Sequence, residues 1–176
     1  MLTKEELQSL SIHATNGWQT QFQRIIRYLR ILQTQKIDYS NWKDINAYLD
    51  VVITCFQNIF HLKDWLLNST TLSNTELNKF IKQHKELGLC RDICNGTKHF
   101  EIKHHASIDK NFMIVRAQDP AYLKNKGPEY FILILSKAGI HQPFAFAKKC
   151  LQLWSDFIIE KNIASKNKLY KLRRNA

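Results

Sequence analysis

The residues most able to do chemistry in this sequence lie in one short stretch near the middle of the chain, LCRDICNGTKHF. Read as a helix at about 100° per residue, it puts Asp92, Asn95 and His99 in a polar row beside an apolar stripe. Arg91 and Lys98 fall on a further flank. A carboxylate, an amide, an imidazole and two cations this close together predict acid–base catalysis in which a cation steadies a phosphate.

The same stretch also has a purely structural interpretation. Lys98 and His99 near a helix C-terminus stabilise the helix macrodipole, and Asn95 can satisfy backbone groups of the loop that follows. This interpretation explains the cations but does not explain why Asp92 and Asn95 share one row. Both interpretations remain open from the sequence.

A second histidine and carboxylate precede this stretch. His61 and Asp64 are three residues apart on a long helix predicted over residues 41–67. They either line a cleft shared with Asp92, Asn95 and His99, and so join the catalytic set, or form an intrahelical hydrogen bond on a half-exposed face.

Metal chemistry is not favoured by the residue spacing. Cys90, Cys94 and His99 can be drawn as a zinc site, but the two cysteines lack the spacing of a zinc knuckle and diverge from the histidine on a helix. Phosphate-binding glycine loops and a nucleophile elbow are also missing from the sequence. We therefore expect no metal and no other cofactor. The four cysteines are expected to be buried, reduced thiols.

The two groups together resemble known proteins. HLKDW on one helix and RDICNGTKH on a later one are similar to an uncharacterised family of small bacterial proteins with the signature H-L-x-D-W … D-x-x-N-x-x-K-H, and more distantly to the HEPN superfamily of ribonucleases. HEPN proteins are helical bundles, often dimeric, that cleave RNA without metal through an arginine and a histidine on one helix. The resemblance implies that Arg91 steadies the scissile phosphate, that His99 moves the proton, and that Asn95 or Asp92 orients them.

The chain departs from the HEPN pattern in one respect. Seven residues separate Arg91 from His99, which turns the two side chains about 80° apart on an ideal helix. Either the helix unwinds near Gly96 and the two converge, or Asp92 takes the inward position and the protein only binds.

The charge is concentrated at the C-terminus. The net charge of the 176 residues is +11, and the last cations of the chain, from Lys161 to Arg174, face no acid in that segment. Such an excess favours polyanions, RNA or DNA first and anionic membranes second. The expected nucleic-acid-binding residues are Lys98, Lys168, Lys171, Arg173 and Arg174. The alternative is a solvated, frayed terminus.

The fold class follows from the periodicity of the apolar residues. Helices are predicted at residues 3–10, from Trp18 onward, at 41–67, at 73–86 with Gly88 as its end, at 89–100 and at 143–162. Two short apolar runs, 111–117 and 130–135, predict an antiparallel pair, and 140–144 either adds a strand or leads into the last helix. We expect an α+β, mainly α domain over residues 1–162: a bundle of four or five helices with a small antiparallel β-sheet before the C-terminal helix. The β insertion covers about 101–142, and 163–176 form a basic tail.

The first function hypothesis is an HEPN-like, RNA-directed protein, a metal-independent endoribonuclease of toxin or defence type. It would act as a homodimer and would have an antitoxin-like protein partner. The alternative is a non-catalytic helical interaction module that binds a protein or nucleic acid, and a metal-dependent helical enzyme is a third. The chain opens without an apolar signal core and has no apolar run that could span a bilayer, so a cytoplasmic location without a membrane partner is expected.

Overall fold

The computed structural model describes residues 17–98, 108–119 and 129–176. Within them the chain forms helices and strands in the order α2 (Trp18–Thr34), α3 (Trp42–Ser69), α4 (Asn74–Gln83), α5 (Lys85–Lys98), β1 (Met113–Asp119), β2 (Glu129–Ser136), β3 (Gly139–His141), α6 (Pro143–Glu160) and α7 (Lys166–Arg174). The predicted α+β, mainly α class is confirmed. The described residues contain six helices instead of four or five, because the basic C-terminal segment is itself a helix. The helix expected at residues 3–10 lies outside the described residues.

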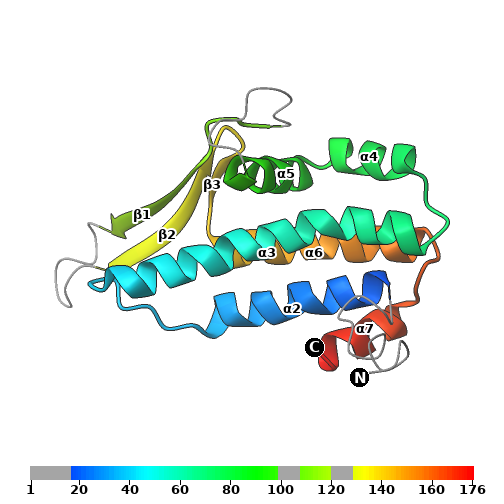
Figure 1. Cartoon of the computed structure of the whole chain (residues 1–176), viewed down its shortest axis with the longest axis horizontal. Helices are drawn as coiled ribbons and strands as arrows, with labels where there is room; N and C mark the ends of the chain where they lie inside the picture. Colours follow the sequence, from blue (N-terminus) through cyan, green and yellow to red (C-terminus); the bar gives the residue numbers. More distant parts are fainter. Residues whose placement is uncertain (1–16, 99–107, 120–128) are drawn as a thin grey trace, which may run out of the picture.

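The long helix α3 is the centre of the bundle. Its apolar side chains repeat at helical spacing, and Ile45, Val52, Phe56 and Ile59 are fully or almost fully buried. Figure 1 shows α3 and α6 in a central layer, with α4 and α5 above it and α2 and then α7 below it. Helix α3 contacts α2, α5 and α6, so both its faces are covered by protein.

The capping box predicted before α4 is confirmed, since Ser73 and Glu76 exchange hydrogen bonds at the helix start. The prediction that Gly88 ends this helix is wrong. Helix α4 stops at Gln83, His84 takes an extended conformation, and α5 begins at once and carries Gly88 inside it. Burial of the residues around Gly88 outweighs the helix penalty of a glycine, which is about 1 kcal/mol. The two helices do not form a hairpin but run one after the other along α3 (Figure 1).

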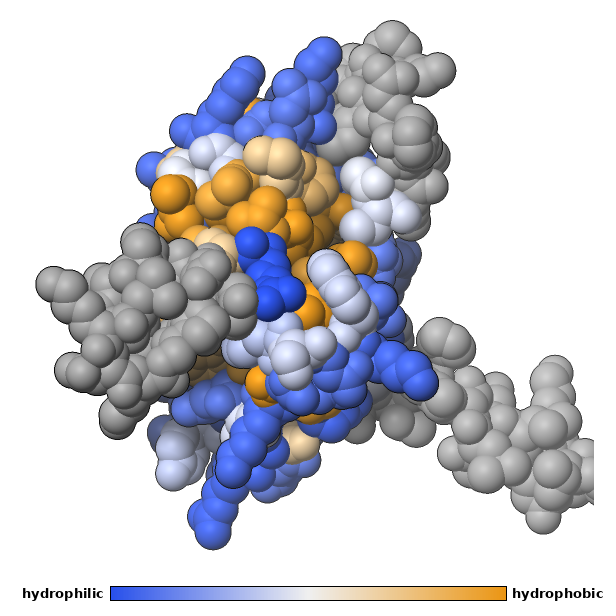
Figure 2. All heavy atoms as spheres, turned by 90° about the vertical axis from the view of Figure 1, so that its left-hand side faces the viewer, coloured by the Kyte–Doolittle hydropathy of each residue, from blue (hydrophilic) through white to orange (hydrophobic). Residues whose placement is uncertain are grey.

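The three strands form an antiparallel sheet in the order β1-β2-β3. Ile132 and Ile134 of β2 are buried on the inner face, against the helices. The register pairs Met113 with Leu135 and Val115 with Leu133, so these four share the opposite, outer face. Figure 2 looks at this end of the molecule and shows apolar residues gathered on it.

The basic C-terminal segment is a packed helix and not a frayed terminus. The Ser165 side chain caps α7 by accepting a hydrogen bond from the backbone of Lys168, and Leu169 is buried against the core. At the other end of α7, a guanidinium nitrogen of Arg30 donates to the backbone oxygen of Arg173 across 2.6 Å. Helix α7 therefore lies fixed against α2. None of the described helices combines the length and the apolar character needed to cross a membrane.

Candidate functional site

The contact between α3 and α5 brings His61 against the helix that carries most of the predicted catalytic residues. His61 Nε2 lies 3.5 Å from Cys94 Sγ, at the less accessible side of α5. One turn away on each helix, Gln57 donates to the Thr97 hydroxyl across 3.0 Å. The partner that α5 offers to His61 is thus the thiol of Cys94, and not one of the polar residues that the sequence predicted.

Asp92 is not part of an open polar row. It is fully buried, and one carboxylate oxygen accepts the backbone amides of Ile108 at 2.7 Å and Asp109 at 2.9 Å. Asp92 therefore joins α5 to the segment that leads into β1, which is a structural role. The helical wheel missed this because it treats α5 as a helix with one buried face, whereas α5 is enclosed on several sides.

The other predicted catalytic residues are dispersed. Arg91 and Asn95 are partly exposed on α5, and Asp64 is exposed on α3. His99 lies outside the described residues, directly after Lys98, the last residue of α5. The convergence of Arg91 and His99 therefore stays a prediction.

The four cysteines are free and buried, as the sequence predicted. Cys90 and Cys150 touch, with 3.4 Å between their sulfur atoms. Burial raises the pKa of Cys55 to about 12, and burial together with the Cys150 thiol raises the pKa of Cys90 well above its usual range. These two thiols are therefore protonated at neutral pH and act as small apolar side chains. Among the described residues, no three His, Cys, Asp or Glu side chains are grouped so as to hold a metal ion.

The strongest concentration of charge lies on α2 and α7, which contact each other. Neither helix contains an aspartate or a glutamate, while α2 has three arginines and α7 has five lysines and arginines. We call the exposed cations of these helices the basic face; its members are Arg27, Arg30, Lys166, Lys168, Lys171, Arg173 and Arg174. Four of these residues were predicted from the sequence to bind nucleic acid. Lys98, the fifth predicted residue, ends α5 on the other side of the bundle.

Helix stability does not account for all of this charge. Lys171, Arg173 and Arg174 occupy the last turn of α7, where cations favour the helix macrodipole. Lys166 and Lys168 occupy its first turn, where the same dipole disfavours them. The stability of α7 therefore explains the cations of its last turn but not those of its first turn.

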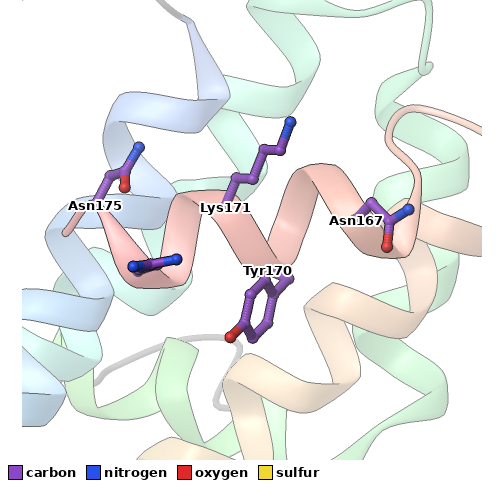
Figure 3. Close-up of a pocket in the computed structure, with 5 residues that line it drawn as sticks. Asn167, Tyr170, Lys171 and Asn175 are labelled. Atoms are coloured by element: carbon purple, nitrogen blue, oxygen red, sulfur yellow. The ribbon is translucent and has the colours of Figure 1, made fainter.

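An exposed aromatic side chain lies among these cations. Tyr170 is 67% exposed and lines a hollow of about 540 Å³ beside α7, together with Lys171 and Arg174. Figure 3 shows that the labelled side chains of this hollow all project from α7. Exposed aromatic rings between cations are typical of surfaces that bind single-stranded nucleic acid. The sequence contains this signal, since Tyr170 lies between Lys168 and Lys171.

The basic face and the contact between α3 and α5 lie on opposite sides of the bundle. In Figure 1, α7 and α2 are below the central layer of α3 and α6, and α5 is above it. One copy of the chain therefore has two separate candidate sites: a charged outer surface, and a more enclosed contact that includes His61 and Cys94.

Comparisons of the chain with protein-family models, with curated proteins and with solved structures found no match. The case for a function therefore depends on the residues and contacts of the two candidate sites.

Proposed function

We propose that the protein binds RNA through the basic face. The observation that carries this proposal is that two contacting helices, α2 and α7, together present seven exposed lysines and arginines and contain no acid. Cations held at fixed positions on a surface displace the counterions of a nucleic acid, which supplies most of its sequence-independent affinity. The fixed position of α7 supports binding further, because the side chains need less ordering when RNA arrives.

Two observations favour RNA over other polyanions. Tyr170 offers an exposed ring on which an unpaired base can stack. The resemblance of residues 41–100 to HEPN ribonucleases points to RNA and not to DNA. Anionic vesicles and DNA of the same length are therefore competing outcomes of the test.

The test compares two variants of equal net charge. In the α7 variant, Lys168, Lys171 and Arg174 are changed to Gln, and in the control variant the exposed Lys79, Lys82 and Lys85 are changed to Gln. Arg173 is left unchanged because its guanidinium donates to the Ser155 hydroxyl across 2.9 Å.

Fluorescence anisotropy with a short labelled RNA measures the affinity of each form. We expect the α7 variant to lose at least about tenfold in affinity at moderate salt, and the control variant to stay near wild type. Equal losses in the two variants would show that net charge, and not the basic face, governs binding. Tighter binding to anionic vesicles than to RNA would identify a membrane surface as the partner.

The second candidate function is metal-independent RNA cleavage by α5. It is supported by the contact that brings His61 to Cys94, on the same helix as Arg91 and Asn95. In this proposal His99 moves the proton and Arg91 steadies the phosphate. Labelled RNA incubated in chelator should be cut by wild type and by His104→Ala, but not by His99→Ala. Cleavage that survives His99→Ala removes this candidate and leaves RNA binding in place.

A homodimer is the proposed state of the protein, and the outer face of the sheet is the surface that supports it. Met113 and Ile140 are more than half exposed, and exposed Trp42 lies beside β1 under the guanidinium of Arg116. Leu133 and Leu135 complete this apolar face, on which two copies can meet, with the guanidinium of Arg116 over Trp42 beside it. Light scattering should show a dimer that Met113→Lys with Ile140→Lys converts to a monomer. A monomeric wild type contradicts this proposal and leaves an antitoxin-like protein as the occupant to test.

A further inference from the structure

A groove between α2 and α6 opens next to the basic face. Its volume is about 360 Å³, and its apolar wall is made by Ile26 and Leu29 of α2 and by Phe144 and Leu151 of α6. Ile26, Leu29 and Leu151 are almost completely buried, whereas Phe144 keeps part of its ring accessible. The wall is therefore apolar, with one aromatic ring that a ligand can reach.

Three cations surround this apolar wall. Arg30 comes from α2, Lys148 lies one turn after Phe144 on α6, and Arg173 reaches the groove from α7. Arg30 and Arg173 each make a hydrogen bond to protein, to the backbone of Arg173 and to Ser155 respectively. A guanidinium has five N–H donors, so both side chains keep donors for a ligand while these bonds hold them in position. The described residues that line the groove include no acid.

These features together select a ligand with a flat apolar body and anionic groups on either side. A phosphate alone gains nothing from the apolar wall, and an apolar molecule alone gains nothing from the cations. A nucleotide has both parts, and the groove is near the lower end of the volumes found for small-molecule sites. Arg30 and Arg173 also belong to the basic face, so a nucleotide in the groove is continuous with RNA bound there.

We infer that the groove between α2 and α6 holds one unpaired base of the bound RNA, stacked on Phe144, and so makes the protein selective for single-stranded RNA. This inference rests on the proposed RNA-binding function. In a duplex, each base is paired and stacked, and turning one out costs a few kcal/mol. Single-stranded RNA presents its bases without that cost. Arg30, Lys148 and Arg173 then contact the phosphates that flank the stacked base.

The test uses two groove variants, Phe144→Leu and Gln33→Trp, each with a control variant, and all four keep the charge of the protein. Phe144→Leu removes the ring but preserves an apolar side chain, and Phe144→Tyr keeps the ring and serves as its rescue. Gln33→Trp places a large side chain at an exposed position lining the groove, and Gln83→Trp makes the same change at an exposed position on α4. Circular dichroism and thermal unfolding establish that each variant is folded before binding is measured.

Affinity is measured for a single-stranded RNA and for a blunt duplex that contains the same strand. Wild type should bind the single strand more tightly, and Phe144→Leu and Gln33→Trp should each weaken that binding about tenfold, as expected for the loss of one base stack. Both groove variants should bind the duplex with wild-type affinity. Phe144→Tyr, which keeps the ring, and Gln83→Trp should bind the single strand with an affinity near wild type. Ultraviolet crosslinking of a uridine-rich RNA should label the peptide that contains Phe144.

Four results overturn the inference. If wild type binds both RNAs equally, or if the groove variants bind the single strand as wild type does, the groove holds no base and the basic face alone explains binding. A crosslink confined to α7 leads to the same conclusion. If wild type binds neither RNA, the proposed function fails and the inference fails with it.

Discussion

Asp92 shows how one buried carboxylate can decide the position of a whole segment. A single oxygen of Asp92 accepts the amides of Ile108 and Asp109, which lie just before β1. Hydrogen bonds to a charged acceptor inside a protein are among the stronger polar contributions to stability. The start of the sheet is therefore positioned from α5, the helix that carries most of the predicted catalytic residues.

Substitution of Asp92 should consequently destabilise the fold. We expect Asp92→Ala to lower the free energy of unfolding by about 2–4 kcal/mol, because two buried amides lose their acceptor. Asp92→Asn keeps an acceptor oxygen and should cost less. Asp64→Ala, at an exposed carboxylate on α3, should change stability by no more than about 0.5 kcal/mol. Urea denaturation measures all three, and an Asp92→Ala variant as stable as Asp64→Ala contradicts the structural role.

Asp109 gives a pH-dependent contribution with a defined sign. The backbone amides of Asn111 and Lys137 donate to its carboxylate and hold its pKa below the ordinary value. Because the unfolded chain takes up this proton first, the contribution of Asp109 is complete above the ordinary aspartate pKa and is lost as the pH falls from there through the lowered pKa of the folded state. The stability difference between wild type and Asp109→Asn should therefore be largest near neutral pH and shrink in acid. A difference that stays constant in urea denaturation down to acidic pH contradicts this.

At the scale of elements, the position of α7 is the feature on which the proposed RNA binding depends. Leu169 is 3% exposed and attaches the helix to the core, and Ser165 caps its first turn. Leu169→Ala should weaken this attachment by about 2–5 kcal/mol, and Ser165→Ala by about 1 kcal/mol. Trypsin should cut α7 faster in both variants, with the larger effect in Leu169→Ala, and RNA affinity should fall in the same order although the charge is unchanged. Trypsin resistance equal to wild type in Leu169→Ala would mean that α7 does not depend on this side chain.

The elements also show what local pattern can and cannot predict. The apolar repeats of α2, α3 and α6, the capping box of α4 and the pairing of β1 with β2 depend on neighbouring residues, and the sequence predicted them. The break at His84 and the helix at 166–174 depend on distant contacts: burial of the residues around Gly88, and a place for Leu169 against the core. The candidate RNA-binding site also has one part that local sequence predicts and one part that depends on distant contacts. The cations of α7 are visible in the sequence, but their continuity with Arg30 and the groove beside Phe144 exists only after folding.

At the scale of the whole molecule, the basic face and the enclosed contact between His61 and Cys94 are separated. The layer of α3 and α6 lies between the basic face and the contact of His61 with Cys94, so the two candidate sites are on different sides of one copy (Figure 1). The proposed RNA binding therefore does not depend on the proposed cleavage site. Cleavage would require a second copy, or a second RNA segment, on the far side.

The salt dependence of RNA binding tests the central claim most directly. The logarithm of the affinity for single-stranded RNA falls with the logarithm of the salt concentration, with a slope of about −0.7 for each phosphate neutralised. The α7 variant, which lacks three cations of the basic face, should show a slope shallower than wild type by about 2. The control variant, which lacks Lys79, Lys82 and Lys85, should keep the wild-type slope. The same slope in the α7 variant as in wild type would contradict the assignment of the basic face as the RNA-binding surface.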